Sequence, residues 1–503
     1  MGSLFWKGKQ ECISNIEALK KKELVPFQLL ESISTPMSIK NDQDWMNLLI
    51  RGDSLLTIHS LLNKFKGAIK LIYIDPPFAT GGEFDYKIQI GEGDDSKKSS
   101  KWIRKQAYTD AWKDGLDSYL NFLYERLLLM KDLLADDGSI YMHLDWHVGH
   151  YIKVMMDEIF GDKNFRNEII WSYPAASAKT KRFYVRSYDT ILFYTKSDNY
   201  LFNDDPNIYM EYSNRVKNAL NKDVNGIFYY RGGSHDGKKL SQKVYIENKG
   251  VFPRDVWTDI PYVRANTIEY QGFSTQKPER LLRRIILAST KENDLIADFF
   301  SGSGTTVVVA EKLNRRWIGC DLSKNAIQIT KKRLLDIKNS NNLFDWKKKY
   351  DKIPREFKIL TIKHTIEENG FPLDFFSKKE NKSLNNMEYL PPHFEIILKR
   401  NANEISLEIK DYKIPYIDFI SYEIKEKISK FSDWIDFWAI DYDFTNQKKF
   451  RNMWVSYRTS KKRTLKLESN PYYYEKPGNY KIMVKVLDIC GVETTKVLDL
   501  DIN

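Results

Sequence analysis

The sequence has little cysteine and no long hydrophobic run. Three of its 503 residues are cysteines, Cys12, Cys320 and Cys490, and they lie far apart with no CxxC spacing. This pattern argues against a disulfide framework and against a cysteine-based zinc cluster. The chain has no run of about eighteen apolar residues, which argues against a membrane span. Residues 1–22 also lack the apolar segment of a secretory signal. We therefore expect a cytoplasmic protein that does not contact a membrane.

The length and the net charge of the chain narrow the possible class of protein further. A chain of 503 residues is too long for one compact core, so we expect two or three domains. The formal net charge is +11, which favours a polyanionic partner such as nucleic acid. Composition alone is weak evidence for such a partner, because a lysine-rich genome composition gives the same excess.

The most informative motif is Asp75-Pro76-Pro77-Phe78, which follows the apolar run 69–74. Such a run is typical of a buried parallel strand, so the motif is expected at the carboxyl edge of a sheet. Asp75 and the carbonyl of Pro76 can accept the two N–H groups of an exocyclic base amine, and Pro77 stiffens the turn. Phe78 can stack on a flipped base, a contact worth roughly 1–3 kcal/mol. The alternative is an ordinary Asp-Pro turn at the end of a strand.

A second motif spans residues 298–306 and predicts a nucleotide cofactor. It runs from Asp298 at a strand end through Gly302 and Gly304, and Thr305 opens the following helix. No lysine follows the second glycine, so this is not a phosphate-binding P-loop. Asp321 ends the next strand 23 residues after Asp298, where a carboxylate can accept ribose hydroxyls. The alternative is a plain strand-to-helix turn with a surface aspartate.

The order of expected elements favours a parallel α/β sheet. Strands and helices alternate in residues 51–164 and again in 277–338. The stretch 165–262 is crowded with aromatic and basic residues, and we interpret it as an insertion carrying a recognition surface. Residues 79–106 are glycine-rich and charged, and are expected to form a long functional loop. Short alternating runs in 390–503 indicate a β-rich C-terminal domain.

Taken together, these motifs resemble the permuted β class of amino DNA methyltransferases, which includes type III modification subunits. The resemblance covers about residues 45–335. It is carried by the blocks 51–54, 72–78, 138–145, 165–171, 188–194, 256–260, 275–282, 298–306 and 316–321. It implies a doubly wound, Rossmann-like methyltransferase sheet with an inserted target-recognition region. The small β-rich C-terminal domain lies outside this match, and residues 477–486 resemble a strand of an immunoglobulin-like sandwich.

The resemblance and the changes of pattern along the chain together predict how the chain is divided. The expected units are an N-terminal extension (1–50), the catalytic half of the methyltransferase domain (51–164), the target-recognition insertion (165–262), the S-adenosylmethionine-binding half (263–340), a basic linker (341–389) and the C-terminal domain (390–503).

The cofactor implied by the resemblance is S-adenosyl-L-methionine. The matching positions are Asp53, Asp75, Thr275, Gln276, Lys277, Pro278, Asp298, Phe300, Gly302, Gly304, Thr305 and Asp321. Among these, Lys277 is expected to pair with the carboxylate of the cofactor. The chain departs from the family pattern at Phe78, where tyrosine is usual, and at Phe299 and Ser301, where proline and often cysteine occur.

The resemblance favours a site-specific adenine-N6 DNA methyltransferase that flips its base and transfers the methyl group directly, within a restriction-modification or related defence system. An aspartate at the head of the catalytic motif favours adenine N6, whereas cytosine-N4 relatives more often carry serine. Three alternatives stay open: a cytosine-N4 enzyme, a DNA-specificity subunit for a nuclease or translocase partner, and a methyltransferase for RNA or a protein amide. The expected partner is double-stranded DNA, and a homodimer or a restriction or translocase subunit are further candidates.

Two clusters are candidates for contact with the DNA backbone. The first comprises Lys179, Lys181, Arg182, Phe183 and Arg186, and the second is the basic stretch 331–363. The alternative for both is a solvated lysine face.

His143, Asp145, His147 and His150 invite a metal-site interpretation. A strand-to-helix junction separates them, so we interpret them as packing at the sheet edge and expect no metal.

Overall fold

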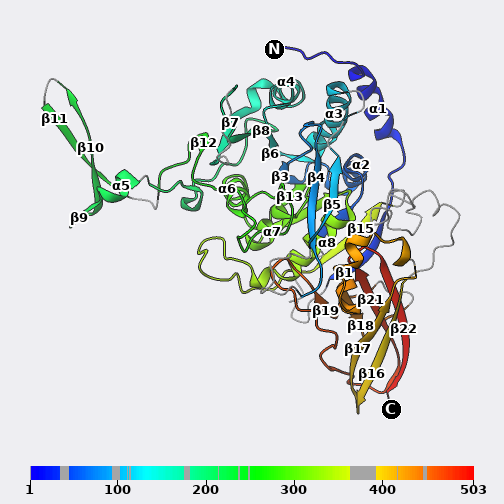
Figure 1. The fold of residues 1–503 in the computed structure, drawn as a ribbon. Coiled ribbons are helices and arrows are strands. Elements are labelled where there is room, and N and C mark those ends of the chain that lie inside the picture. Colours follow the sequence, from blue (N-terminus) through cyan, green and yellow to red (C-terminus); the bar gives the residue numbers. More distant parts are fainter. Residues whose placement is uncertain are drawn as a thin grey trace.

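A ten-stranded mixed sheet forms the centre of the main body (Figure 1). The computed structural model describes residues 2–33, 45–92, 102–109, 112, 115–174, 182–212, 214–235, 238–246, 250–362, 392–415, 417–445 and 450–502. Within these residues the strand order is β1-β15-β2-β14-β13-β3-β6-β8-β7-β12. The bounds are β1 Phe27–Ile33, β2 Asn47–Arg51, β3 Ile69–Ile74, β6 Leu134–Leu144, β7 Phe165–Ser172, β8 Tyr188–Thr195, β12 Val256–Trp257, β13 Leu295–Asp298, β14 Arg316–Asp321 and β15 Phe357–Ile362.

The six strands from β15 to β6 are parallel to their neighbours, and helices cover both faces of this part. Their apolar runs are buried, as in β3, where Leu71, Ile72 and Ile74 are 0% exposed. Helices α1 Lys9–Lys21, α2 Ser54–Phe65, α3 Leu116–Leu133 and α4 Gly149–Phe160 share one hydrophobic cluster. Helices α6 Glu279–Ser289, α7 Thr305–Lys312 and α8 Lys324–Leu335 share the cluster on the other face. The arrangement is the doubly wound sheet expected from the sequence.

The chain order reverses between the neighbouring strands β3 and β13. From β3 the chain continues to β6 on one side, and from β13 it continues to β14 on the other. Ligands of open α/β sheets bind outside the carboxyl ends of the strands at such a switch point. The two sequence motifs follow β3 and β13, so the topology brings them together.

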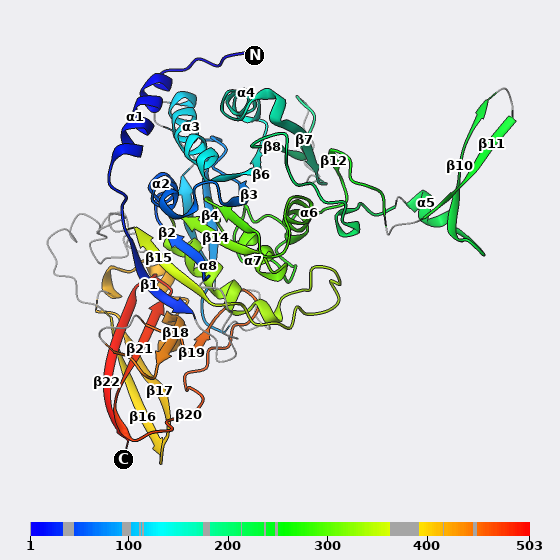
Figure 2. The ribbon, with the colours of Figure 1, turned by 180° about the vertical axis from the view of Figure 1, so that it is seen from behind.

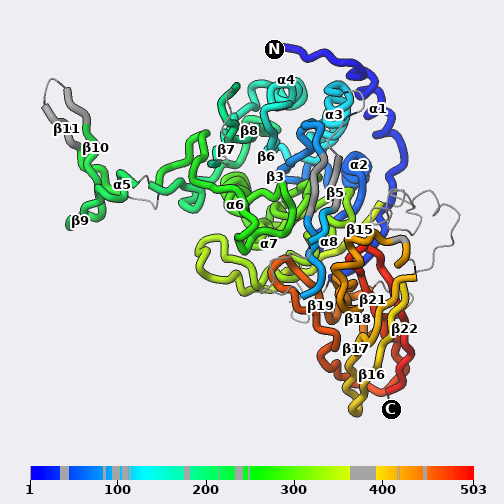
Figure 3. The backbone as a smooth tube through the Cα atoms, in the orientation of Figure 1, coloured from blue at the N-terminus to red at the C-terminus, as the bar shows by residue number. Residues whose placement is uncertain are grey.

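Part of the expected insertion 165–262 contributes to the large sheet. Strands β7, β8 and β12 belong to the large sheet, because their apolar side chains, among them Trp171, Phe193 and Trp257, are buried in the core. An arm leaves the body after β8 and returns before α6 (Figures 1 and 3). It is built from α5 Asn214–Asn218, β9 Asn221–Asp223, β10 Gly226–His235 and β11 Lys238–Tyr245.

The expectation of a loop at 79–106 is wrong, because the structure has two paired strands in this range. Strands β4 Glu83–Gln89 and β5 Trp102–Thr109 pair as an antiparallel hairpin. The hairpin has little local signal in the sequence, because the apolar side chains that anchor it, Ile90 and Ile103, pack into a hydrophobic cluster formed mainly by residues beyond 390.

Residues 392–502 form two antiparallel sheets around that cluster, and we call this part the C-terminal β unit (Figure 2). One sheet contains β16 His393–Asn401, β17 Glu404–Lys413 and β20 Tyr472–Tyr473. The other contains β18 Ile435–Asp441, β19 Trp454–Tyr457, β21 Gly478–Asp488 and β22 Glu493–Ile502, and a short helix α9 spans Tyr422–Lys425.

Two expected boundary segments contribute to the large sheet. Strand β1 comes from the expected N-terminal extension and pairs with β15 from the expected basic linker. The division of the chain into domains stays a prediction. Among the residues that the structure describes, no helix combines the length and the apolar character needed to cross a membrane.

Candidate active site

A cavity of about 570 Å³ opens at the switch point between β3 and β13. Its volume lies in the range typical of sites for small ligands. Its walls come from the carboxyl ends of β2, β3, β13 and β14 and from the segment before α6. Of the residues expected to hold a cofactor, those that line it are Asp53, Asp75, Thr275, Gln276, Lys277, Asp298, Phe300, Gly302, Thr305 and Asp321. Pro278 and Gly304 do not line the cavity, and they lie beside residues that do.

Asp75 is half-buried at the end of β3, and its two carboxylate oxygens differ. Oδ2 accepts a hydrogen bond from Lys277 Nζ at 2.7 Å. Oδ1 is buried and has no hydrogen-bond partner. A buried acceptor without a partner costs roughly 1–3 kcal/mol. The expectation that Lys277 binds a cofactor carboxylate stays a prediction, since its ammonium contacts Asp75 in this structure.

Phe78 lies at the outer end of a chain of buried polar groups. Its ring stacks on His143, with centroids 6.2 Å apart and planes 19° apart. His143 is 0% exposed; its Nδ1 lies 2.8 Å from the hydroxyl of Tyr73, and its Nε2 lies 3.0 Å from Asp189 Oδ2. Burial alone would raise the pKa of Asp189, but the hydrogen bond with His143 keeps it below its ordinary value. Asp189 therefore fixes the proton on Nε2 and the orientation of the ring.

Asp298 ends β13 and is bound by its own turn. Its Oδ1 accepts a hydrogen bond from the backbone N–H of Phe300 at 3.0 Å, and its Oδ2 accepts one from the hydroxyl of Thr306 at 2.5 Å. The side chain is buried, and burial raises the pKa of Asp298 to about 7. The carboxyl group therefore stabilises the turn that leads into α7.

Gly302 and Asp321 join the ends of β13 and β14. Gly302 has a φ of +48°, and its N–H donates to Asp321 Oδ2 at 2.8 Å. Asp321 Oδ1 accepts from the N–H of Ser323 at 2.9 Å, and burial raises the pKa of Asp321. At Gly304 a Cβ would lie 2.5 Å from the side chain of Thr330, so this glycine is required by the contact between α7 and α8.

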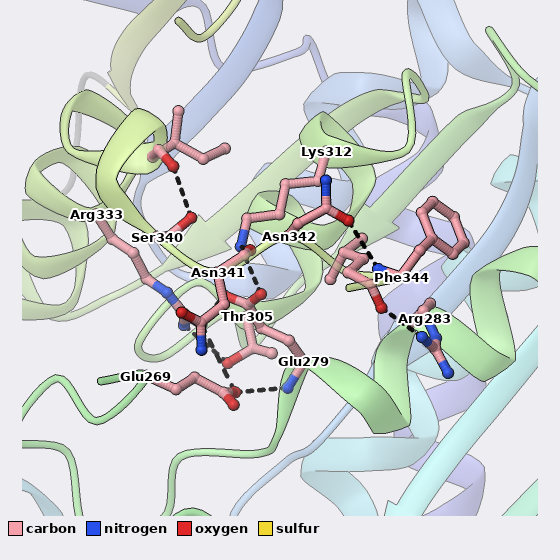
Figure 4. A network of polar contacts seen from close by, with 12 residues as sticks. Glu269, Glu279, Arg283, Thr305, Lys312, Arg333, Ser340, Asn341, Asn342 and Phe344 are labelled. Carbon is pink, nitrogen blue, oxygen red and sulfur yellow. Dashed lines mark hydrogen bonds and ion pairs between the residues drawn. The ribbon is translucent and has the colours of Figure 1, made fainter. Parts of the chain in front are cut away.

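A buried ionic network fixes the segment before α6 against α7 and α8 (Figure 4). Glu279 pairs with Arg333 at 2.8 Å and with Lys312 at 2.6 Å, and Arg333 also donates to Thr305. The hydroxyl of Thr305 in turn donates to the carbonyl of Lys277 at 3.0 Å. Burial and the neighbouring Glu279 raise the pKa of Glu269 to about 7. The network therefore sets the backbone from which Lys277 reaches Asp75.

Asp53 has two structural contacts at the rim of the cavity. Its Oδ1 caps α2 through the N–H groups of residues 55 and 56, and its Oδ2 accepts from Arg126 at 2.8 Å. Gln276 is also bound within the protein. Its Oε1 accepts a hydrogen bond from the N–H of Gln271, and its Nε2 donates one to the carbonyl of Glu269.

Sequence reasoning missed the aromatic wall of the cavity. Trp112 and Phe122 contact each other at 5.0 Å between centroids, Phe122 contacts Phe300 at 5.9 Å, and Phe273 lies across from Gly302. The spacing of Phe122 within α3 marked it as one apolar residue of an amphipathic helix, so the sequence carried no separate signal for it.

The first DNA-contact candidates are only partly described. Lys179 and Lys181 lie outside the described residues. Phe183 is 59% exposed, and the guanidinium of Arg186 lies 3.7 Å from the ring centroid of Trp146, which is itself 42% exposed. Arg182, which directly precedes Phe183 in the chain, is exposed. The structure thus shows an exposed cation–aromatic cluster just beyond β6, the neighbour of β3.

The histidines near β6 have other partners. His143 contacts Asp189, and His147 Nδ1 lies 2.5 Å from Asp145 Oδ2. Within the described residues, no group of three or more histidine, cysteine or acidic side chains is arranged to hold a metal ion.

The fold and the site define a Rossmann-like α/β methyltransferase: a doubly wound sheet, a cavity for a small ligand at its switch point, and an Asp-Pro-Pro-aromatic turn beside that cavity. Residues 69–332 match the model of the DNA methylase family. The chain belongs to that family and is a DNA methyltransferase.

Curated relatives agree with this assignment. The type II methyltransferase M.EcaI of Enterobacter cloacae is 30% identical over 329 residues, which cover 57% of this chain and 69% of M.EcaI. The DNA adenine methyltransferase YhdJ of Escherichia coli is 30% identical over 287 residues, covering 57% of this chain and 82% of YhdJ. A protein of Haemophilus influenzae described as a probable type III restriction-modification enzyme HindVI Mod subunit is 26% identical, covering 55% of this chain and 48% of that protein.

Among solved structures, the M1.HpyAVI–SAM complex is similar with a TM-score of 0.35 and 18% identity. The similarity covers 57% of this chain and 98% of that one.

Proposed function

We propose that the protein transfers a methyl group from S-adenosyl-L-methionine to the N6 amine of adenine in duplex DNA, at a specific sequence. The observation that carries this proposal is the unpaired Oδ1 of Asp75, which is buried at the end of β3 beside the cavity. An exocyclic amine supplies the N–H that this acceptor lacks. Such an amine must be taken out of the base stack to reach it.

The residues of the chain have separate tasks in this reaction. S-adenosyl-L-methionine supplies an electrophilic methyl group on its sulfonium. Asp75 Oδ1 accepts one N–H of the amine, which directs the nitrogen lone pair away from the ring, and it holds the proton that the nitrogen loses on methylation. Lys277 fixes the other oxygen of Asp75. Phe78, supported from behind by His143, offers its outer face to the base.

The residues of the cavity fit a nucleoside cofactor. The N–H of Gly302 and the carboxylate of Asp321 form one polar end at β13 and β14. The aromatic wall of Phe122, Phe273 and Phe300 suits a purine face. Asp53, Thr275 and Lys277 complete the polar lining.

The projecting arm is suited to reading the duplex. A two-stranded β-ribbon fits the major groove of DNA, and β10 and β11 form such a ribbon away from the body (Figure 2). Its exposed side chains include Tyr230 and the basic residues Lys222, Arg231 and Lys243. The contact between Arg186 and Trp146, just beyond β6, offers the duplex a second cationic and aromatic surface.

Two observations support adenine as the target base, and two relatives support a restriction-modification setting. Aspartate heads the catalytic turn, and the relative YhdJ is described as a DNA adenine methyltransferase. M.EcaI is described as a type II methyltransferase and the HindVI relative as a type III Mod subunit. The chain is therefore proposed to protect host DNA against a restriction partner.

The proposal is tested by expressing the protein in a host without DNA methylation and sequencing the genome with detection of modified bases. Asp75→Asn and the exposed control Asp136→Asn are expressed alongside. We expect N6-methyladenine at one repeated motif with the wild type and the control, and none with Asp75→Asn. N4-methylcytosine in place of N6-methyladenine overturns the choice of base, and an unmodified genome overturns the proposed activity of the chain on its own.

A further inference from the structure

The C-terminal β unit is docked on the methyltransferase body through a buried ionic contact. Glu31 of β1 accepts hydrogen bonds from Lys331 of α8 at 2.5 Å and from Lys485 of β21 at 3.1 Å. Burial alone would raise the pKa of Glu31, but the two lysines lower it to about 2. Lys332 of α8 adds a pair with Asp436 of β18 at 2.8 Å. The unit is therefore held in one orientation on α8, next to the cavity.

From this position the unit holds the hairpin that follows the catalytic turn. Ile90 and Ile103, at the far ends of β4 and β5, are 0% and 6% exposed within the hydrophobic cluster of the C-terminal β unit. In Figure 1 the strands labelled β4 and β5 run side by side from the body towards this unit. The carbonyl of Trp102 accepts from Lys427, and a Cβ at Gly91 would lie 2.5 Å from Asp433. In the chain, the hairpin lies between Phe78 and Trp112 of the cavity wall. Its far end is held by the C-terminal β unit.

One loop of the unit contacts both segments that shape the site, and we call residues 458–463 the clamp loop. Arg463 donates to the carbonyls of Gln89 and Gly91 in the hairpin. The hydroxyl of Ser460 donates to the carbonyl of Tyr270 at 2.7 Å, in the segment that leads to Gln276 and Lys277. The two segments also bond each other, because the N–H of Lys87 donates to the carbonyl of Gly272 at 3.0 Å.

The clamp loop is itself rigid. Arg458 is 1% exposed and donates to the carbonyl of Ser432 at 2.7 Å and to the carbonyl of Arg463 at 2.9 Å. Arg463 closes the loop through the carbonyl of Thr459 at 3.0 Å. The loop therefore transmits the position of the C-terminal core to the hairpin, because few soft torsions lie between them.

We propose that the C-terminal β unit is a brace for the methyltransferase site, and that Arg463 and Ser460 are positioning residues that fix the β4–β5 hairpin and the 270–277 segment. Through them the unit fixes the hairpin that joins Phe78 to Trp112 in the chain, and the segment that carries Lys277, whose ammonium lies 5.2 Å from the ring centroid of Phe78. The link to methyl transfer rests on the function proposed above. The mechanical link, from clamp loop to hairpin, stands independently of that function.

The test compares Arg463→Ala and Ser460→Ala with Arg400→Ala in the full-length protein. Arg400 is an exposed arginine of the same unit whose contacts lie within that unit, so it controls for loss of a guanidinium. Hydrogen exchange of residues 83–92 and 102–109 is measured by mass spectrometry. We expect Arg463→Ala to speed exchange there about tenfold, Arg463→Lys to restore part of the protection, and Arg400→Ala to leave it unchanged.

Methyl transfer is measured on the same samples. We expect Arg463→Ala to lower kcat about tenfold and Ser460→Ala about threefold, with thermal midpoints matching that of Arg400→Ala. Hairpin exchange equal to that of Arg400→Ala overturns the brace, whatever the activity. Faster exchange in a protein whose wild type transfers no methyl group overturns the proposed function and leaves the brace standing. Faster exchange with unchanged kcat overturns the positioning role.

Discussion

Asp75 and Asp298 occupy equivalent places at the ends of the neighbouring parallel strands β3 and β13, and their surroundings differ. Asp298 has both oxygens bound within its own turn, and burial raises its pKa to about 7. Asp75 has one oxygen on Lys277 and one buried oxygen without a partner. A carboxylate that its own turn satisfies stabilises that turn, whereas one left incomplete is available to a substrate. The fold places both carboxylates, and their different hydrogen bonds distinguish the structural role of Asp298 from the catalytic role that we propose for Asp75.

The same substitution at both positions gives the largest expected difference. In Asp75→Asn, Lys277 attracts the amide oxygen, so the amide N–H₂ faces the base amine and places donor against donor. We expect the single-turnover rate of methyl transfer to fall about 10³-fold or more, with cofactor affinity changed less than about threefold. Asp298→Asn is expected to lower the rate about tenfold, because it acts through the turn. Similar losses in both variants contradict the division of roles.

A second comparison is between Gly302, which lines the cavity proposed to bind the cofactor, and Gly304, which lies at the contact between α7 and α8. A Cβ at Gly302 lies in ordinary contact with Phe273, whereas a Cβ at Gly304 meets Thr330 at 2.5 Å. Gly302→Val projects a branched side chain into the cavity and is expected to weaken cofactor binding about 100-fold in calorimetric titrations.

Gly304→Ala is the matched variant for the packing between α7 and α8. It is expected to lower the thermal midpoint because its Cβ meets Thr330, while cofactor affinity at low temperature stays near that of the wild type. A reversal of the two effects contradicts the assignment of the two glycines.

Much of this site could be predicted from the sequence, because its parts are local. An apolar strand followed by Asp75-Pro-Pro-Phe, and another followed by Asp298 and two glycines, fix the fold class and the switch point from short segments. The pairing of Lys277 with Asp75, 202 residues apart, depends on how α6 packs and leaves no local signal. The β4–β5 hairpin was missed for the same reason, since Ile90 and Ile103 find their hydrophobic partners beyond residue 390.

The raised pKa of Asp298 predicts that the free energy of unfolding falls as the pH rises towards neutrality. In the unfolded chain the pKa of Asp298 is near its ordinary value of 3.8, and in the folded protein burial raises this pKa to about 7. The folded state therefore binds the proton more tightly, so the stability that Asp298 contributes is full below pH 3.8 and is lost as the pH rises to 7. The Asp298→Asn variant has no titrating carboxyl group at this position, so it does not lose this stability as the pH rises. We expect Asp298→Asn to gain roughly 2–3 kcal/mol relative to wild type between pH 5 and pH 8.

Urea unfolding at several pH values checks this expectation. The exposed control Asp136→Asn gives the background from a change of net charge. A stability difference between Asp298→Asn and wild type that does not vary with pH shows that Asp298 is ionised in the folded protein near neutral pH.

The smallest effect is expected where the chain departs from its family, at Phe78. A hydroxyl added by Phe78→Tyr leaves the ring face available for stacking, so we expect the transfer rate to change less than about threefold. Phe78→Ala removes a stacking contact worth roughly 1–3 kcal/mol, and the rate is expected to fall about 10- to 100-fold. Transfer rates are measured on duplex DNA with adenine at the target position. Base flipping is measured separately on DNA that carries 2-aminopurine there, because the fluorescence of this analogue rises when it leaves the stack. Equal signals from Phe78→Ala and wild type show that another group, such as Trp146, supports the flipped base.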